Sequence, residues 1–530
     1  MRRTLIHDLN DLQHEHGHLR RSDLEALARR SGRPLYEIQG LLSFYPHFRT
    51  EPPPAHEVTL CRDMSCWLRD GADQGASVEA ALAGRGDVAV KRVSCIGRCD
   101  CAPAATVNER PCRVQDVIDL VDGREVPPLE TPAQSWETDP YESASDRYGV
   151  LRAALAGEIS REEIVARLEG SGLRGMGGAG FPTGLKWKLV AGEPATPKYV
   201  ICNADESEPG TFKDREILRQ LPHLVIEGML LGMFVVGAGE GIIFVRHEYG
   251  PEEDALRAEL REARERGHLS GDRDIEIFTS PGGYILGEET ALLDCLEGRR
   301  GEPRNKPPFP GTRGLWGQPT LINNVETFHH VPTVVGFGER FEAQGRPGHK
   351  GLKFISVSGH VERPGVYCVP MGTTVAELIE QAGGMQDGRE LAAFAPGGAS
   401  SNFLPAGDRG VELDFATLQE AGSMLGSGAM VAVAEGTDVL ALATNVLEFF
   451  SNESCGKCVP CRVGSRKAVS IMHTALAGPA ANGGGGWQET VTELEEALRL
   501  TSICGLGQVA LGPVLSVLRN FPAGEPVSAP

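Results

Sequence analysis

The stretch ESCGKCVPC at residues 453–461 places three cysteines at successive two-residue gaps, and TSICG at residues 501–505 supplies a fourth. Cysteine thiolates are the usual ligands of iron–sulfur clusters, and four of them suit the corners of a 4Fe-4S cube. Structural zinc is the alternative, although zinc sites more often pair two separated Cys-x-x-Cys hooks. We therefore predict a 4Fe-4S site with the ligands Cys455, Cys458, Cys461 and Cys504.

The residues after this cysteine run predict a helix with basic side chains at Arg462, Arg466 and Lys467. A helix N-terminus carries partial positive charge, and nearby cations add to it. Both would favour an anionic cluster beside them. The sequence thus predicts a cluster at the start of a C-terminal helical bundle.

Length and charge restrict the class of protein. A chain of 530 residues predicts about three to five domains. The formal net charge of -20 argues against a nucleic-acid surface. No apolar run is long enough to span a bilayer, and polar residues within 7–11 interrupt any signal core. We expect a cytoplasmic protein without membrane insertion, in which the thirteen cysteines bind metal or fill the core rather than form disulfides.

Two further pairs of cysteines lie near the N-terminus. A helical stretch over about 4–48 precedes a strand at 57–60, and a second strand is expected at 88–93. The four thiols after these strands can hold a 2Fe-2S cluster. The alternatives are a zinc site or a redox disulfide on a thioredoxin-like scaffold, and Cys101 could replace the last ligand. The candidate ligands are Cys61, Cys66, Cys95 and Cys99.

With the leader ending in LSFYPHF at residues 42–48, this pattern resembles the thioredoxin-like 2Fe-2S ferredoxin family found in the 24-kilodalton subunit of complex I. The resemblance covers about the first 120 residues. It implies that the ligands are the four cysteines just named and that Cys101 is spare.

A glycine-rich segment, GLRGMGGAGFPTGLKW at residues 172–187, follows a Pro-, Glu-, Ser- and Thr-rich linker at 123–146 and a helix. Gly175, Gly177 and Gly180 spell G-x-G-x-x-G, which alone is weak, because a helix rather than a strand precedes it. A flexible turn is the alternative. Glycines nevertheless let a phosphate or flat ring approach backbone amides, and Lys186 could neutralise a phosphate.

Alternating strands and helices then predict a Rossmann-like α/β domain. The expected strands are 199–202, 241–245 and 274–278, and the expected helices are 214–237 and 251–267. Two loops, 203–210 and 282–290, combine acids with glycines. Acids beside phosphate-friendly glycines would repel a polyanion unless they bind hydroxyl or amide groups. Ribityl, ribose and carboxamide groups meet that requirement.

Several long segments resemble the 51-kilodalton NADH-binding flavoprotein subunit of complex I, over about residues 145–525. They are 172–187, 202–215, 283–290, 304–310, 322–327 and the closing cysteines. The resemblance implies FMN beside the 4Fe-4S cluster. It carries FMN contacts to Gly175, Gly177, Lys186, Asn203, Asp205, Tyr284, Gly287, Glu288, Asn323 and Asn324. It carries NADH contacts to Phe181, Glu206, Glu208, Glu289, Lys306 and Phe309.

Within this resemblance, Phe181 and Phe309 would stack on adenine. Glu208 near the adenosine ribose would disfavour a 2'-phosphate, so NAD rather than NADP is expected. Glu206, Glu208 and Glu289 are expected to orient the nucleotide rather than transfer protons, because the hard chemistry belongs to the cofactors. One departure is Met176, where complex I subunits commonly have Arg. This difference weakens the assignment of the family's outer loop contacts to this chain and suggests a relative with a different partner.

The remaining segments complete a multidomain α/β architecture. Strands at 354–359 and 365–369, a helix at 374–383 and the apolar run 430–433 predict a β-grasp, SLBB-like module before the helical 4Fe-4S bundle. Four cysteines without partners at ligand spacing are expected to be small buried residues, namely Cys112, Cys202, Cys295 and Cys368. The expected domains are 1–122 for the helical leader with the 2Fe-2S domain, 123–146 for the linker, 147–348 for the FMN- and NADH-binding domain, 349–436 for the β-grasp domain and 437–530 for the helical 4Fe-4S domain.

Together these features predict a diaphorase subunit that exchanges hydride between NAD(H) and FMN and single electrons with the clusters. Fusion of both modules, without an added ferredoxin domain, favours the beta subunit of an NAD-dependent formate dehydrogenase with a molybdenum or tungsten alpha subunit. The alternatives are the diaphorase subunit of an NAD-reducing hydrogenase, a complex I-like NADH dehydrogenase, and a non-catalytic iron–sulfur redox sensor or scaffold.

Overall fold

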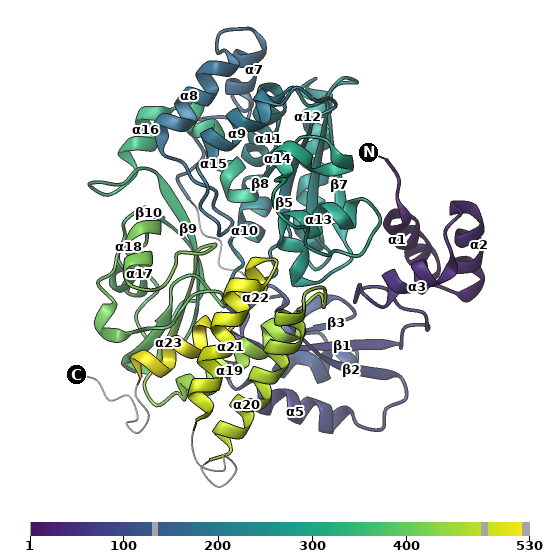
Figure 1. Cartoon of the computed structure of the whole chain (residues 1–530), viewed down its shortest axis with the longest axis vertical. Coiled ribbons are helices and arrows are strands. Elements are labelled where there is room, and N and C mark those ends of the chain that lie inside the picture. Colours follow the sequence, from purple (N-terminus) through teal and green to yellow (C-terminus); the bar gives the residue numbers. More distant parts are fainter. Residues whose placement is uncertain (1, 130–135, 479–485, 522–530) are drawn as a thin grey trace.

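The central part of the chain forms a parallel four-stranded sheet (Figure 1). The structure is a computed structural model, which describes residues 2–129, 136–478 and 486–521. The strand order is β7-β6-β5-β8, so the order reverses between β5 and β8. In parallel sheets, ligands bind beyond the carboxyl ends of strands at such a reversal. The strands are β5 Tyr199–Ala204, β6 Glu240–Arg246, β7 Asp274–Ser280 and β8 Thr320–Asn324.

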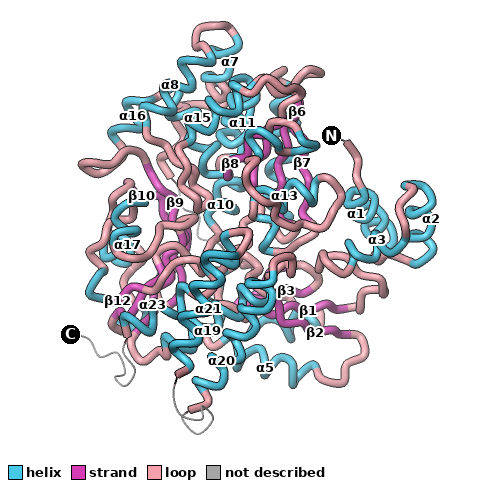
Figure 2. Tube along the Cα trace, viewed as in Figure 1, coloured by secondary structure: helices cyan, strands magenta, loops and turns pink. Residues whose placement is uncertain are grey.

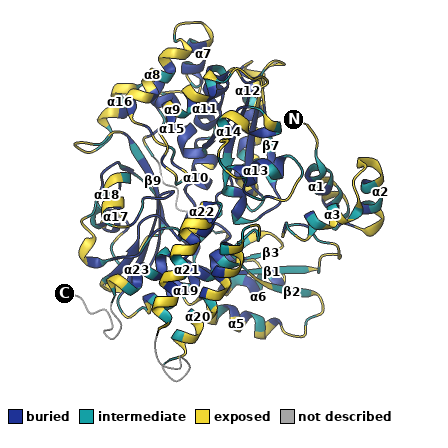
Figure 3. Ribbon diagram, viewed as in Figure 1, coloured by how far each residue is buried: buried dark blue, intermediate teal, exposed yellow. Residues whose placement is uncertain are grey.

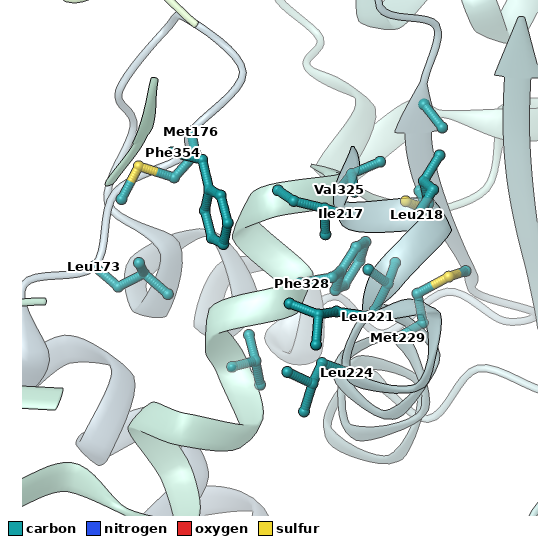
Figure 4. Close-up of a cluster of buried hydrophobic side chains, with 14 of the residues drawn as sticks. Leu173, Met176, Ile217, Leu218, Leu221, Leu224, Met229, Val325, Phe328 and Phe354 are labelled. Carbon is teal, nitrogen blue, oxygen red and sulfur yellow. The ribbon is translucent and has the colours of Figure 1, made fainter. Parts of the chain in front are cut away.

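Helices cover this sheet and supply its core (Figure 2). Helices α11 and α15 pack on each other, and Leu224 and Phe328 lie in the buried cluster between them (Figure 4). The helices are α7 Gly149–Leu155, α8 Arg161–Ser171, α9 Thr183–Gly192, α10 Lys213–Gln220, α11 Pro222–Val236, α12 Gly250–Glu265, α13 Glu289–Leu296, α14 Pro310–Arg313, α15 Val325–Gly336 and α16 Gly338–Ala343.

The single helix expected over 214–237 is wrong, because α10 and α11 meet at a 93° bend. Pro222 begins α11 and cannot donate a backbone hydrogen bond, and it restricts the residue before it. Among the described residues no single helix is long and apolar enough to cross a bilayer, and this bent pair passes that test only when its two helices are taken together.

The N-terminal part consists of a three-helix bundle and a mixed sheet. The bundle lies against the edge of the central sheet, where Asn10 Nδ2 donates to Thr279 O at 3.4 Å and Tyr45 OH donates to Arg299 O at 2.5 Å. The second sheet has the order β2-β1-β3-β4. The elements are α1 Leu5–His16, α2 Arg21–Ser31, α3 Leu35–Leu42, β1 His56–Cys61, α4 Met64–Leu68, α5 Gly71–Leu82, β2 Val88–Val93, β3 Ala104–Val107, β4 Arg110–Arg113 and α6 Val117–Val121.

A third sheet of order β10-β9-β13-β11-β12 forms the β-grasp module. Strands β9 and β10 form the expected antiparallel hairpin, and β13 pairs with β9 in parallel. The elements are β9 Leu352–Gly359, β10 Gly365–Pro370, α17 Val375–Gln381, β11 Leu391–Ala395, β12 Leu404–Pro405, α18 Phe415–Glu420 and β13 Ala429–Ala434.

The C-terminal helices lie between the other parts of the molecule (Figure 1). Helix α19 contacts α4 of the N-terminal domain, and α23 contacts β12. The inner helix α19 is largely buried, whereas α20 shows much exposed surface (Figure 3). The elements are α19 Val439–Asn452, a π-helical turn at Pro460–Gly464, α20 Ser465–Leu476, α21 Trp487–Thr501, α22 Gly505–Val509 and α23 Gly512–Asn520.

The end of the stretch expected to be a linker is packed against the central and β-grasp domains. Trp136 meets Phe354 edge-on with ring centroids 5.0 Å apart, and Tyr141 OH donates to Glu227 at 2.8 Å. Residues 130–135 lie outside the described part of the chain. Aromatic side chains that gain buried contacts therefore fix 136–141, although this segment lacks sequence periodicity.

Two buried arginines join the N-terminal domain to the central domain. Arg215 Nη1 donates to Gly97 O at 2.6 Å, and Arg215 Nη2 pairs with Asp100 at 2.8 Å. Arg246 Nη2 donates to Cys95 O at 3.0 Å, and its Nη1 donates to Glu206 O at 2.5 Å. A guanidinium removed from water requires such partners. These contacts fix the 95–100 loop on the central domain.

Replacing Arg215 by Met should lower the free energy of unfolding by about 3–5 kcal/mol, because it leaves the buried Asp100 carboxylate unpaired. The matched change Arg219→Met removes a half-exposed partner of Glu216 and should cost about 0–1 kcal/mol. Urea unfolding followed by circular dichroism measures both. Equal losses in the two variants would contradict the assigned role of Arg215.

Candidate functional site

The ends of β5 and β8 form the floor of the candidate nucleotide site. The two strands pair in parallel with Asn203 opposite Asn324. Asn203 Nδ2 donates to Gly287 O at 2.9 Å and thereby attaches the loop after β7 to the end of β5. Three separate segments thus meet at the reversal of strand order, as expected for a ligand site.

Asp205 is the polar group in this floor that most clearly requires a ligand. Both carboxylate oxygens are buried without a hydrogen-bond partner among the described residues. Burial raises the pKa of Asp205 to about 7, and the nearby Arg246 and Ser280 only partly offset this effect. A buried acceptor without a partner costs free energy, which hydroxyl donors of a bound molecule would recover. The ribityl hydroxyls of FMN supply such donors, so this residue fits the predicted cofactor.

The glycine-rich loop crosses above this floor. Gly178 has φ +120°, a conformation that favours glycine, and a Cβ at Gly177 would lie 2.9 Å from Asn324 Cβ. The loop therefore approaches β8 more closely than a side chain permits. Trp187 Nε1 donates to Asn323 Oδ1 at 3.0 Å, which attaches the following helix α9 to the same strand.

Charged side chains form a compact group beside the loop. Lys306 Nζ contacts Glu288 at 2.9 Å and Glu289 at 3.0 Å, and Lys186 Nζ lies 4.0 Å from Glu289. Burial lowers the pKa of Lys186, whereas the two glutamates act against burial and raise the pKa of Lys306. The group holds two lysines and two glutamates, so its formal charges balance. Lys186 is the less closely paired of the two lysines, and a phosphate oxygen is an acceptor suited to its ammonium group.

Two aromatic rings remain exposed near this charged group. Phe181 is 42% exposed and Phe309 is 60% exposed. Phe309 directly precedes α14, which packs on α9. Exposed rings on loops around a polar site suit stacking against a flat base.

Several predicted contact residues are already engaged by protein groups. The Glu206 carboxylate accepts from the backbone N–H groups of Asp214 and Arg215 and from Tyr249 OH, at 2.9, 3.1 and 3.0 Å. It therefore stabilises the start of α10. Burial raises the pKa of Glu206 to about 7.

Glu208 and Asn324 are also held by the protein. Glu208 Oε1 accepts from Ser400 N of the β-grasp domain at 2.7 Å, and burial raises the pKa of Glu208 to about 7. Asn324 Oδ1 caps α15 by accepting from Glu326 N at 3.0 Å, while its Nδ2 donates to Asp214 at 2.5 Å. Both side chains position loops around the site.

The Met176 side chain faces the interior of the protein rather than the outer side of the glycine-rich loop. Met176 is only 3% exposed and lies in the apolar core beside Phe354 (Figure 4). Its N–H donates to Thr327 Oγ1 at 2.9 Å. An apolar side chain gains free energy by this burial, so the residue faces inward.

The C-terminal cysteines gather next to the nucleotide site. Cys461 is the second residue of the helical turn before α20, and Cys504 lies at the N-cap position of α22. Burial raises the pKa of Cys461 to about 11, and neighbouring thiols add to this rise. Burial also raises the pKa of Cys504 to about 12, with a further contribution from Glu288. Cys461 and Cys504 are buried, whereas Cys455 and Cys458 are half-buried. Thiols that gather next to helix starts suit a metal cluster, which replaces their protons.

The N-terminal thiols converge from two segments of the chain. Cys61 ends β1 and Cys66 lies in α4. The Sγ atoms of Cys95 and Cys99 lie 3.4 Å apart. The backbone N–H groups of Gly97, Ala104 and Gly210 donate to Sγ atoms of this group at 3.4 Å. Such donors stabilise thiolates, so this arrangement also fits a cluster.

Cys101 lies among charged groups. Burial raises its pKa to about 12, and Asp100, Arg215 and Arg113 modify that value. The other unassigned cysteines, Cys112, Cys202 and Cys295, are buried, whereas Cys368 is half-buried.

Sequence reasoning missed the residues that hold the site loops in place. They are Arg246, Tyr249 and Ser400, together with Glu453, which accepts from Tyr284 N at 2.9 Å. No local spacing marks them, because each acts across a long sequence separation. Glu453 adjoins the cysteine run, which is the only sequence signal that points to it.

Four family models match the chain. They describe a thioredoxin-like [2Fe-2S] ferredoxin at residues 1–120, a Nuo51 FMN-binding domain at 168–333, an SLBB domain at 354–403 and the NADH-ubiquinone oxidoreductase-F iron–sulfur binding region at 441–524. The predicted fold class is therefore confirmed, as are FMN, the 4Fe-4S cluster and the 2Fe-2S cluster as cofactors.

Curated relatives match the larger, C-terminal part. A subunit of the NADH-quinone oxidoreductase of Rhizobium meliloti is 43% identical over 389 residues, which cover 72% of this chain and 91% of the relative. The NADP-reducing hydrogenase subunit HndC of Solidesulfovibrio fructosivorans is 39% identical over 368 residues, which cover 68% of this chain and 74% of the relative.

A solved structure matches almost the whole chain. It is the crystal structure of an NAD+-reducing [NiFe]-hydrogenase in the air-oxidised state, with a TM-score of 0.86 and 30% identity. The match covers 98% of this chain and 93% of the other. The chain therefore belongs to the NADH-quinone oxidoreductase-F family of oxidoreductase subunits, and joins to it a thioredoxin-like [2Fe-2S] ferredoxin domain.

Proposed function

We propose that this chain is a diaphorase subunit that exchanges hydride between NAD(H) and FMN and single electrons with its iron–sulfur clusters. The contact that carries this proposal joins the two sites, because Tyr284 N donates to Glu453 at 2.9 Å. The Tyr284 ring also packs on Phe449, with centroids 4.9 Å apart. The nucleotide loop and the 4Fe-4S loop are thus adjacent.

The bound FMN supplies the conversion between two-electron hydride chemistry and one-electron transfer. The protein groups bind and orient. Asp205 accepts from ribityl hydroxyls, Lys186 neutralises phosphate, and Phe181 and Phe309 stack on adenine. Glu289 and Lys306 orient the nucleotide, whereas Glu206 and Glu208 hold the loops that surround it.

The proposed FMN contacts also include backbone approach at Gly175, Gly177 and Gly287, and polar contact at Asn203, Tyr284, Glu288, Asn323 and Asn324. We assign the 4Fe-4S cluster to Cys455, Cys458, Cys461 and Cys504, and the 2Fe-2S cluster to Cys61, Cys66, Cys95 and Cys99. We retain the domain boundaries at 122, 348 and 436, and we move the start of the central domain from 147 to 136, because Tyr141 OH donates to Glu227 of that domain. We place the protein in the cytoplasm, where thiol ligands stay reduced.

The partner is proposed to be the molybdenum or tungsten alpha subunit of an NAD-dependent formate dehydrogenase. The joining of the two redox modules in one chain supports an NAD-linked metalloenzyme. The second candidate is an NAD-reducing hydrogenase, which the near full-length likeness to the hydrogenase chain favours. A surface next to the 4Fe-4S loop suits either partner. It is formed by Val459, Val463 and Leu500, which are 59%, 54% and 64% exposed.

The cysteine assignments can be tested by single substitutions. Cys455→Ser should remove the 4Fe-4S electron paramagnetic resonance signal and leave FMN and the 2Fe-2S signal, because the two thiol groups lie in separate domains. Cys61→Ser should remove the 2Fe-2S signal and leave FMN and the 4Fe-4S signal. The control Cys101→Ser should keep both signals. Loss of the 2Fe-2S signal in this control, with retention in Cys99→Ser, would reassign the fourth ligand.

The affinity of the apoprotein for FMN should rise with pH between about 6 and 8, by at most tenfold per unit. The pKa of Asp205 is raised to about 7 in the ligand-free site. Hydroxyl donors would stabilise the carboxylate and lower that pKa, so binding releases a proton and is favoured at higher pH. Flavin fluorescence quenching measures the affinity.

Riboflavin separates this effect from titration of the FMN phosphate, because it carries the same ribityl hydroxyls without phosphate. Asp205→Asn should flatten the pH profile for riboflavin and should leave for FMN only the part that the phosphate titration causes. A profile that is unchanged in this variant would show that Asp205 does not accept from the ribityl chain.

The purified, cofactor-loaded chain should oxidise NADH with a dye acceptor, whereas a redox sensor or scaffold would not.

The proposed partner surface can be tested with the partner from the native cell. Val459→Ser combined with Val463→Ser should weaken binding of that partner about tenfold or more, because two apolar side chains no longer gain burial. Dye reduction should persist. Leu476→Ser, 39% exposed at the far end of α20, is the control.

Pull-down followed by formate-dependent and hydrogen-dependent NAD reduction identifies the partner. A molybdenum or tungsten subunit and formate activity support the first candidate. A nickel–iron subunit and hydrogen activity would replace it with the second. A loaded chain that cannot reduce the dye would overturn the diaphorase proposal itself.

A further inference from the structure

The Ser454 hydroxyl lies within hydrogen-bond distance of a proposed 4Fe-4S ligand. Ser454 Oγ is 3.1 Å from Cys461 Sγ. On its other side, Ser454 Oγ accepts from Gly456 N at 3.4 Å. An oxygen that accepts from one neighbour keeps its own proton for another. The local turn therefore orients the hydroxyl proton toward the sulfur.

The direction of this hydrogen bond becomes fixed when the cluster is bound. A cysteine that ligates iron is a thiolate and has no proton to donate. Ser454 must then be the donor and Cys461 Sγ the acceptor. A hydrogen bond to a charged acceptor is stronger than one between neutral groups.

Ser502 supplies a second hydroxyl close to Cys461. Ser502 is only 6% exposed, and its Oγ is buried without a hydrogen-bond partner among the described residues. A Cβ added to Gly507 would lie 2.4 Å from Ser502 Oγ and 3.0 Å from Cys461 Cβ. The hydroxyl and the ligand therefore border the same small space, which only glycine leaves open.

A buried hydroxyl without a partner costs free energy, so its position requires an acceptor. No described group lies within hydrogen-bond distance of the Ser502 hydroxyl to supply one. The sulfur atoms of a cluster held by Cys461 and Cys504 are acceptors of the required kind. Ser502 precedes Cys504 by two residues.

Two of the other proposed ligands, Cys455 and Cys504, receive hydrogen bonds from the backbone. The N–H of Lys457 lowers the pKa of Cys455 against the effect of burial, and the N–H groups of Leu506 and Gly507 act in the same way on Cys504. Side-chain substitution does not remove backbone donors. Ser454 and Ser502 are thus the hydrogen-bond donors that a side-chain substitution can remove without changing the backbone at the cluster.

We propose that Ser454 and Ser502 raise the reduction potential of the 4Fe-4S cluster by donating hydrogen bonds to its sulfur atoms. Reduction adds one electron and makes the cluster more negative, so donors stabilise the reduced state more than the oxidised state. The two hydroxyl groups thereby make the cluster a better electron acceptor within the relay. This inference rests on the ligand assignment proposed above.

Redox titration of the intact, cofactor-loaded chain followed by electron paramagnetic resonance tests the proposal. Ser454→Ala should shift the 4Fe-4S midpoint potential downward, whereas Ser454→Thr, which keeps the hydroxyl, should stay near the wild-type value. Ser502→Ala should also shift the potential downward, and the double variant should show the largest shift. The 2Fe-2S cluster in the same sample is an internal control and should not shift.

A purely structural role predicts a different result, namely fewer 4Fe-4S clusters per chain with an unchanged midpoint potential in those that remain. That result, or an unchanged potential in both alanine variants at full iron content, would overturn the proposal. If Ser454→Ala loses the cluster, Ser502→Ala decides the question. Failure of the ligand assignment is separately visible, because Cys461→Ser would then retain the 4Fe-4S signal.

Discussion

The architecture depends on two guanidinium groups that are buried between the N-terminal and central domains. Arg215 and Arg246 each bind the loop that carries Cys95 and Cys99, and each also belongs to the domain that forms the nucleotide site. A cation without water must be paired, so these domains cannot separate without a large electrostatic cost. The 2Fe-2S site and the nucleotide loop therefore keep a fixed relation, which electron transfer requires.

The loop at residues 203–210 contributes to both the candidate flavin site and the candidate 2Fe-2S site. Both carboxylate oxygens of Asp205 are buried without a hydrogen-bond partner among the described residues, and Gly210 N donates to Cys99 Sγ of the candidate 2Fe-2S site. Between them, Glu206 secures α10, and Glu208 reaches the β-grasp domain. These two acids are tolerated here because both accept hydrogen bonds from backbone N–H groups. Asp205 lacks such donors among the described residues, which distinguishes it from Glu206 and Glu208 and supports its proposed role in binding a ligand.

On the opposite side, the cysteine loop meets the flavin loop through Glu453 and Tyr284. Lys457 Nζ also donates to Pro303 O at 2.7 Å, which attaches the cysteine loop to the segment that carries Lys306. The nucleotide site thus lies between two cysteine groups, and each is joined to it by short polar contacts. The fold brings together cofactors whose ligands are separated by hundreds of residues.

The sequence by itself determined the fold class, the cofactor set and the grouping of the cysteines, because ligand spacing, glycine runs and strand periodicity are local properties. It also placed β2 at residues 88–93 and the hairpin of β9 and β10 closely. It could not show the bend at Pro222, the inward side chain of Met176, or the capture of Glu206 and Asn324 by helix starts. Those outcomes depend on which partners lie nearby after folding. Only the tertiary structure decided which acid of the 203–210 loop has no donor among the described residues, namely Asp205, and that Ser454 and Ser502 lie beside Cys461. Hydrogen-bond satisfaction depends on packing across distant segments.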